Sequence, residues 1–204
     1  MDTILMAIED LIFAVISCTV QLVAILDPVA VVPIYLTYVG SYSREVFSRV
    51  TRTIALFVFI LSLAISLGGR LWLLLLGVSV AALKVGGGVL LMAIAIDALS
   101  GLPRTKVAYR EDVPVVPIAT PLLVGPGTIT LLLVLPYRYG FAATLIAIVL
   151  ATLVTYLVLR FSRSLMKLLG RSGVVAVSRL TSIVIAAFAA EMIYSGLRDW
   201  GLVR

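Results

Sequence analysis

Long uncharged and mostly apolar stretches alternate with short charged segments along the whole chain. The stretches are Leu11 to Ser43 with only Asp27 inside, Thr53 to Gly69, Leu71 to Ile96 with only Lys84 inside, Val113 to Tyr137, Tyr139 to Leu159, and about Val174 to Trp200. A helix needs about 20 apolar residues to cross a bilayer. The pattern therefore predicts an all-α integral membrane protein with six transmembrane helices.

The third stretch is too long for one straight crossing. A single helix from Leu71 to Leu99 would measure about 43 Å at 1.5 Å per residue, which exceeds the hydrocarbon core of about 30 Å. We therefore expect a turn near Gly77 to Ser79, where two small residues flank Val78.

Composition supports the membrane assignment and excludes an attached aqueous domain. The 204 residues are 62% hydrophobic and 13% charged, whereas soluble domains are about 25% charged. The net charge of +6 is therefore interpreted through topology and contact with anionic lipid rather than nucleic acid. The chain has no His and one cysteine, Cys18, so we predict no cofactor, metal site or disulfide. Asn is absent and Gln occurs once, at Gln21, which fits a heat-adapted source.

The first stretch has the length of a signal peptide but the wrong charge. Asp2, Glu9 and Asp10 give it an acidic start, and no Lys or Arg precedes Arg44, so we interpret it as a retained span.

Basic residues gather in alternate connections between the predicted spans. One side receives Arg44, Arg49, Arg52, Arg104, Lys106, Arg110, Arg160, Arg163, Lys167 and Arg171, and the other receives Arg70, Arg138, Arg198 and Arg204. The positive-inside rule then predicts that both termini lie outside the cell membrane.

An internal repeat divides the chain into two halves, about 1–103 and 108–204, within one transmembrane domain. LDPVAVVPIYLT (26–37) aligns with ATPLLVGPGTIT (119–130) at an offset of 93, and LKVGGGVLL (83–91) aligns with SRLTSIVIA (178–186) at an offset of 95. Each repeat would hold three spans, so the second copy enters the membrane in the opposite sense. Such inverted repeats are common in alternating-access transporters.

Matched prolines predict that spans one and four are broken helices. Asp27-Pro28 and Thr120-Pro121 each resemble an N-cap followed by proline at the first helical position. Pro33 and Pro126 follow at the same spacing, and Gly125 and Gly127 flank the latter. A plain proline kink is the simpler explanation for one such site. Two at equivalent places favour a substrate site, because paired interrupted segments mark the binding sites of transporters.

Ionisable residues within the spans are expected to face the protein interior and to pair. Besides Asp27 they are Lys84, Asp97, Arg179 and Glu191. Their depths along the spans predict the pairs Lys84 with Glu191 and Arg179 with Asp97, acting as buried ion pairs or gates. Snorkelling of the side chains to the interface is the alternative.

Two further segments allow more than one interpretation. Gly86, Gly87 and Gly88 either permit close helix contact or expose backbone to a substrate cavity. The segment Phe161 to Arg171 carries Arg163, Lys167 and Arg171 at four-residue spacing and is predicted to be a basic interfacial helix.

These motifs resemble the MarC family of prokaryotic six-span membrane proteins. The resemblance rests on DPVAVVP in the first span, LKVGGG in the third, VPIATPLLVGPGTIT (116–130) in the fourth and MKLLGRSGVVAVSRLTSIV (166–184) near the sixth. The family often has a glycine shortly after Asp-Pro, where this chain has Val29-Ala30-Val31. Since the family includes a small neutral amino acid transporter of archaea, the resemblance implies transport of amino acids such as glycine, alanine and serine.

We therefore expect a secondary transporter that holds its substrate at the midplane between the two broken helices. The predicted substrate-binding residues are Asp27, Pro28, Val29, Ala30, Pro33, Gly86, Gly87, Thr120, Pro121, Gly125, Pro126, Gly127 and Thr128. A coupling proton or sodium ion is an expected partner, and the sequence leaves the oligomeric state open. The alternatives are export of another small metabolite, drug or ion, and an intramembrane enzyme that uses Asp27 and Glu191 as a carboxylate pair. The matched breaks and the absence of His argue against the enzyme.

Overall fold

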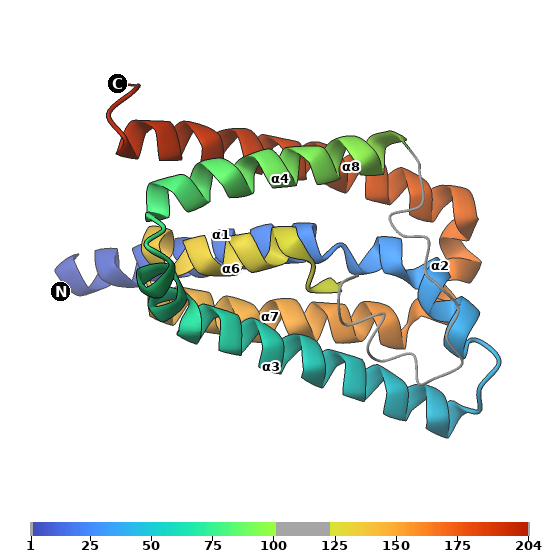
Figure 1. Ribbon diagram of the computed structural model, residues 1–204. Coiled ribbons are helices and arrows are strands. Elements are labelled where there is room, and N and C mark those ends of the chain that lie inside the picture. The colour runs from blue at the N-terminus through green and yellow to red at the C-terminus, as the bar shows by residue number, and fades with distance from the viewer. Residues whose placement is uncertain (1, 101–122, 204) are drawn as a thin grey trace.

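The computed structural model describes residues 2–100 and 123–203, and every regular element within these ranges is a helix (Figure 1). The helices are α1 (Asp2–Leu26), α2 (Pro28–Val39), α3 (Arg44–Leu76), α4 (Val80–Ser100), α6 (Pro126–Tyr139), α7 (Phe141–Arg160) and α8 (Ser162–Asp199). The predicted all-α class is thereby confirmed for the described part of the chain.

Five segments are long and apolar enough to cross a membrane. They are Met6–Leu26, Arg44–Gly69, Val80–Leu99, Phe141–Arg160 and Ser172–Asp199. The predicted fourth span, Val113 to Tyr137, lies partly outside the described residues, and α6 includes the described end of it. Many large apolar side chains on these helices point outward, among them Phe13, Leu74 and Leu180, as expected for helices that face lipid rather than water.

The predicted turn between the second and third spans is present. Gly77 ends α3 in the left-handed conformation, with φ 64° and ψ 21°, which glycine adopts without a steric penalty. The Ser79 hydroxyl then accepts a hydrogen bond of 3.1 Å from the Ala82 amide at the start of α4. Helix α3 is longer than the apolar run from Thr53 to Gly69 predicts, because no helix-breaking residue separates that run from its neighbours on either side.

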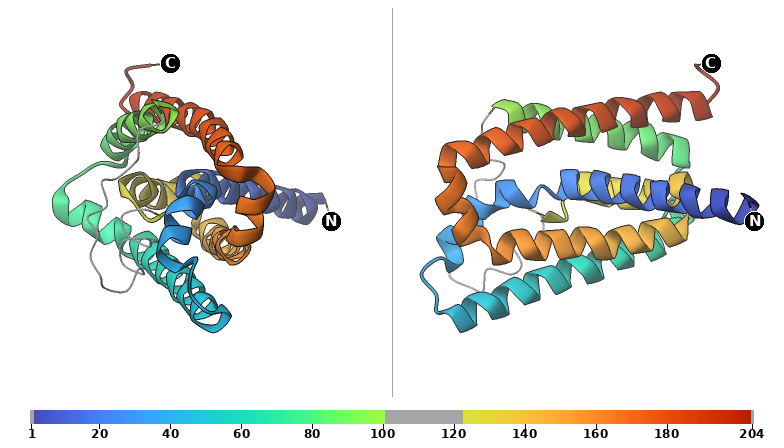
Figure 2. Two further views of the ribbon diagram at one scale, coloured as in Figure 1. Left: turned by 90° about the vertical axis from the view of Figure 1, so that its right-hand side faces the viewer. Right: turned by 180° about the vertical axis from the view of Figure 1, so that it is seen from behind.

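The helices form three stacked layers, seen in Figure 1 and from behind in Figure 2. Helices α4 and α8 make one outer layer, α1 and α6 the middle layer, and α3 and α7 the other outer layer. The main core lies where the middle layer meets the layer of α3 and α7. Its fully buried residues include Leu22, Tyr35, Ile54, Leu132 and Ile148. Both ends of the described chain lie at the same end of this bundle (Figures 1 and 2).

Helices α4 and α8 form the most extensive helix pair, and glycines allow them to approach closely. A Cβ atom added to Gly88 would lie 2.7 Å from the Ala189 carbonyl oxygen on α8. A Cβ atom added to Gly196 on α8 would lie 2.8 Å from the Ala81 carbonyl oxygen on α4. Small residues at such contacts are the usual means of packing helices within a membrane.

A sharp bend divides α8 into a short and a long part. Gly170 has φ 65° and ψ 179°, so the helix axis changes direction there, and the part that starts at Ser162 lies across the end of the bundle (Figure 2). Within it, Arg163 donates hydrogen bonds of 3.1 Å and 2.9 Å to the carbonyl oxygens of Gly40 and Tyr42. This arginine of the predicted basic helix therefore binds the connection that follows α2.

Candidate functional site

The chain changes direction at Asp27, between the end of α1 and the start of α2. Asp27 has φ 40° and ψ 59°, a left-handed conformation that non-glycine residues seldom adopt. Pro28 has no amide hydrogen, so the Ala24 carbonyl loses its usual donor four residues later. The Asp27 carboxylate accepts a hydrogen bond of 3.3 Å from the Ala30 amide and so caps α2. A helix interruption and an acidic side chain therefore coincide within the apolar part of the protein.

Ser178 on α8 contacts the same carboxylate. Asp27 is only 2% exposed, and its second oxygen accepts a hydrogen bond of 3.0 Å from the Ser178 hydroxyl. The two residues are 151 positions apart, and sequence analysis missed the serine. The available signal was its place at the start of the second repeat match, directly before Arg179 in an otherwise apolar stretch.

A cavity of about 580 Å³ lies beside Asp27, between α1, α2, α7 and α8. Its lining residues are Thr19, Val20, Val23, Ala24, Asp27, Pro28, Val29, Val154, Val158, Leu180, Thr181 and Val184. The Thr19 and Thr181 hydroxyls donate to carbonyls of their own helices, at 2.7 Å and 3.1 Å. The cavity thus combines apolar walls with one carboxylate, and its volume lies in the range of small-molecule sites.

The start of α6 lies beside the end of α1. Gly125 precedes the helix in an extended conformation and Pro126 is its first residue. A Cβ atom on Gly127 would lie 3.7 Å from Ile25 on α1, and 2.6 Å and 3.1 Å from Leu91 and Ile94 on α4. The backbone of Gly127 is therefore covered by apolar side chains in this conformation.

Three predicted residues of the second helix break remain, and the structure describes one of them, Thr128. The Thr128 hydroxyl donates to the Leu123 carbonyl at 2.9 Å and so stabilises the approach to α6. Thr120 and Pro121 lie outside the described residues.

Gly86 and Gly87 do not line the cavity beside Asp27. Gly86 is exposed, and a Cβ atom there would meet nothing within 4 Å. Gly87 is buried against Thr130 of α6 and Met192 of α8. Of the two interpretations of this glycine run, the structure favours close helix contact for Gly87 and Gly88.

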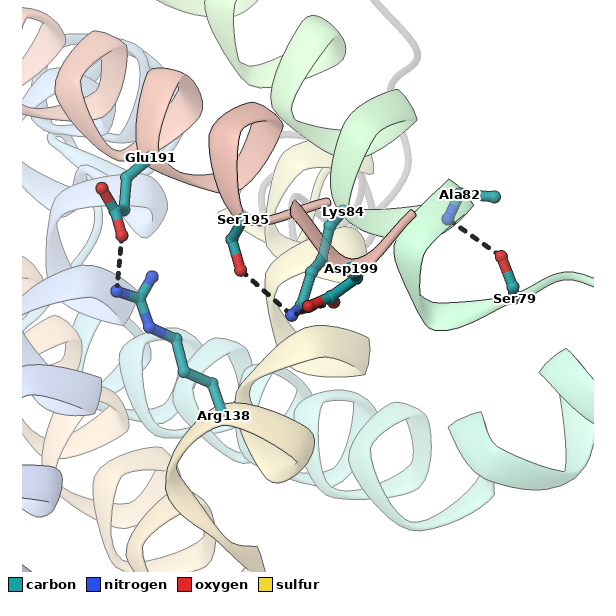
Figure 3. Close-up of polar contacts among 7 residues, drawn as sticks. All are labelled: Ser79, Ala82, Lys84, Arg138, Glu191, Ser195 and Asp199. Atoms are coloured by element: carbon teal, nitrogen blue, oxygen red, sulfur yellow. Dashed lines mark hydrogen bonds and ion pairs between the residues drawn. The ribbon is translucent and has the colours of Figure 1, made fainter. Parts of the chain in front are cut away.

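The charged residues pair differently from the prediction (Figure 3). The Lys84 ammonium lies 2.6 Å from Asp199 and 3.1 Å from the Ser195 hydroxyl, instead of meeting Glu191. Glu191 accepts a hydrogen bond of 3.1 Å from Arg138 at the end of α6. The predicted Lys84–Glu191 pair is therefore wrong.

The antiparallel register of α4 and α8 explains this difference. Gly196 packs against Lys84, and Ile193 packs against Gly88, so Lys84 lies opposite the last turns of α8. Glu191 is more than one turn away from that level, and its side chain is 51% exposed. Depth estimated from span boundaries alone was not accurate to one helical turn.

Asp97 and Arg179 are both exposed, and neither forms an ion pair with any residue in the described ranges. The prediction that they pair with each other is therefore also wrong. Their positions agree with the alternative, in which the charged ends extend towards the interface.

Comparison with known proteins places this architecture in a family. Residues 12–201 match the model of the MarC family integral membrane protein. The chain belongs to this family. The prediction from DPVAVVP and VPIATPLLVGPGTIT is thereby confirmed at the level of the family.

Relatives occur in both archaea and bacteria. The chain is 30% identical over 187 residues to a UPF0056 membrane protein of Methanocaldococcus jannaschii, covering 86% of this chain and 91% of the relative. It is 31% identical over 188 residues to a UPF0056 membrane protein of Archaeoglobus fulgidus, covering 86% and 88%. The UPF0056 membrane protein YhcE of Escherichia coli is 28% identical over 193 residues, covering 88% and 89%. No solved structure matches.

Proposed function

We propose that this MarC protein is a secondary transporter of small neutral amino acids such as glycine, alanine and serine. The observation that carries the proposal is the buried Asp27 carboxylate, which lies at a helix interruption and borders a cavity of about 580 Å³. An ionisable group inside a membrane is costly and usually marks a substrate or ion pathway.

A zwitterionic substrate needs unlike partners at its two ends. In the proposal its ammonium group meets the Asp27 carboxylate, and its small side chain lies against apolar residues such as Val23 and Val154. Its carboxylate meets the first amides of α6, from Gly125 to Thr128, because the first turn of a helix offers unpaired N–H groups and a positive dipole end. Thr120 and Pro121, which lie outside the described residues, are predicted from the sequence alone to belong to this half of the site.

Alternating access through an inverted repeat of three plus three spans is the proposed mechanism. Helices α3 and α7 run in opposite directions, as do α4 and α8 (Figure 1), which supports a two-fold axis in the membrane plane. In the proposal the predicted fourth span, Val113 to Tyr137, whose described end lies in α6, brings the number of spans to six. Both ends of the described chain lie at the same end of the bundle, which agrees with an even number of crossings, and the basic residues favour termini outside.

The packing suggests which parts move. Helices α4 and α8 are closely joined through glycines, so we expect them to move as one unit. Leu91 and Ile94 of α4 cover Gly127, and a shift of this unit would uncover the start of α6. Arg138 and Glu191 link α6 to α8 and would separate in the same movement. A proton or sodium ion would drive the cycle.

Counterflow in proteoliposomes tests the proposal. Purified protein is reconstituted into vesicles loaded with unlabelled glycine, and uptake of labelled glycine, alanine, serine, leucine and glutamate is followed. We expect uptake of the three small neutral amino acids above that of protein-free vesicles, and little uptake of the other two. If none of the three is exchanged, the substrate assignment is wrong, and export of another metabolite, drug or ion takes its place. Hydrolytic activity without any exchange would favour an enzyme.

A further inference from the structure

A second cavity lies on the outer face of the bundle, between α3 and α7. Its volume is about 330 Å³, and it is lined by Ala55, Leu56, Phe59, Val149, Thr152, Leu153 and Tyr156. It shares no lining residue with the cavity beside Asp27. Because both helices are long enough to span the membrane, this groove opens towards the hydrocarbon core.

Two exposed arginines continue the groove at one end. Arg52 precedes Ala55 and Leu56 by three and four residues, and Arg160 follows Tyr156 by four residues. Residues at these spacings lie on the same helix face. Since α3 and α7 are antiparallel (Figure 1), Arg52 and Arg160 come to the same end of the groove. Neither forms an ion pair with a residue of the described ranges.

The groove has the depth of one membrane leaflet. Arg160 and Val149 are 11 positions apart on one helix, which is about 16 Å at 1.5 Å per residue. Half of a hydrocarbon core of about 30 Å is nearly the same distance. With the arginines at the head-group level, the apolar lining therefore reaches about the middle of the bilayer.

We propose that this groove binds one anionic phospholipid, with its phosphate between Arg52 and Arg160 and a hydrocarbon chain along α3 and α7. Guanidinium groups form bidentate hydrogen bonds with phosphate oxygens. Anionic lipids concentrate beside basic residues at the membrane surface. The Tyr156 hydroxyl lies one turn from Arg160, at the depth where tyrosine is enriched. A protein partner is less suited, since it would have to cover both arginines and supply the matching acids.

Lipid retention measured by native mass spectrometry tests this site. The protein is purified in detergent and titrated with phosphatidylglycerol or phosphatidylcholine of the same chain length. We expect one phosphatidylglycerol to bind at least ten-fold more tightly than phosphatidylcholine. In the double variant Arg52→Gln with Arg160→Gln the two affinities should become equal. The matched control is Lys167→Gln, an exposed basic residue of α8 that does not line the groove, and it should keep the preference.

A further variant tests the apolar half of the site. Thr152→Trp fills the groove without changing charge, and we expect it to weaken both lipids about equally. Equal affinity of the parent protein for the two lipids would overturn the proposal, and this measurement does not depend on any variant folding. An unchanged preference in the double arginine variant would also overturn it. A dimer that survives lipid removal and is lost in Thr152→Trp would instead assign the groove to a contact between copies.

Discussion

Helix α8 meets the first half of the chain in two regions of opposite character. Along α4 the contact is continuous, passes through Gly88 and Gly196, and ends in the ion pair of Lys84 with Asp199. Beside the α1–α2 junction α8 donates a hydrogen bond from Ser178 to the buried Asp27, next to a cavity of about 580 Å³.

The difference separates a close-packed contact from the proposed binding site. In the α4 region the charged pair is partly exposed, with side-chain exposures of 12% for Lys84 and 43% for Asp199, and the interior is filled by small residues. In the α1–α2 region the order is reversed, because the carboxylate is buried and space remains around it. Buried charge beside free volume is costly for folding, which is why we place ligand binding there.

Asp27→Asn should have the largest effect on transport. Asparagine caps helices about as well as aspartate, so the variant should fold and insert, but it cannot attract a substrate ammonium group. We expect glycine counterflow to fall more than ten-fold, with an unchanged elution profile in detergent. Asp97→Asn, which changes an exposed carboxylate on α4, is the control and should retain exchange. If Asp27→Asn transports glycine as well as the parent, the carboxylate is only a cap.

Gly88→Ala should break the contact between α4 and α8. The new Cβ atom would lie 2.7 Å from the Ala189 carbonyl oxygen and 2.6 Å from Ile193, so the helices must move apart. Overpacking of this kind costs about 1–3 kcal/mol of unfolding free energy, measurable by chemical unfolding in detergent micelles. Gly86→Ala is the matched control on the same helix. It meets nothing within 4 Å and should be neutral or stabilising by up to about 1 kcal/mol. Equal losses in both variants would contradict this packing.

Ser178→Ala should have a smaller effect on exchange than Asp27→Asn. Removing the hydroxyl takes one donor from a buried carboxylate, and a hydrogen bond to a charged group contributes about 1.5 kcal/mol. We expect exchange of glycine to fall several-fold, while Ser178→Thr restores part of it. Ser182→Ala is the control, because the Ser182 hydroxyl donates to the Ser178 carbonyl of its own helix, at 2.8 Å, and does not contact the Asp27 carboxylate within the described residues. A loss as large in Ser182→Ala would point to helix distortion instead.

Lys84→Gln should have the smallest effect. Partly exposed ion pairs contribute about 0–1 kcal/mol, so the variant should lose less than 1 kcal/mol of unfolding free energy. Lys84→Asp combined with Asp199→Lys should recover most of the loss seen in either single variant. A loss above about 3 kcal/mol would show that the pair is effectively buried, since that is the cost of breaking a desolvated pair.

Local features of the site could be predicted from the sequence. Asp27-Pro28 specifies a helix start, because aspartate accepts from the first amides and proline fixes the backbone, and the structure has α2 beginning at Pro28. Gly77 likewise specifies the end of α3. The partners of Lys84 and Glu191 could not be predicted, since an error of one turn in helix register exchanges one partner for another.

The sequence by itself determined that this is an all-helical membrane protein of the MarC family with a capped helix start at Asp27. These features depend on hydrophobicity over about 20 residues and on bonds between near neighbours, which are set before the helices meet. Only the tertiary structure decided that Ser178 reaches Asp27, that Gly87 and Gly88 serve packing, and that Lys84 binds Asp199. Those contacts depend on the axial offset between two packed helices. The fit of side chains across the whole interface fixes that offset.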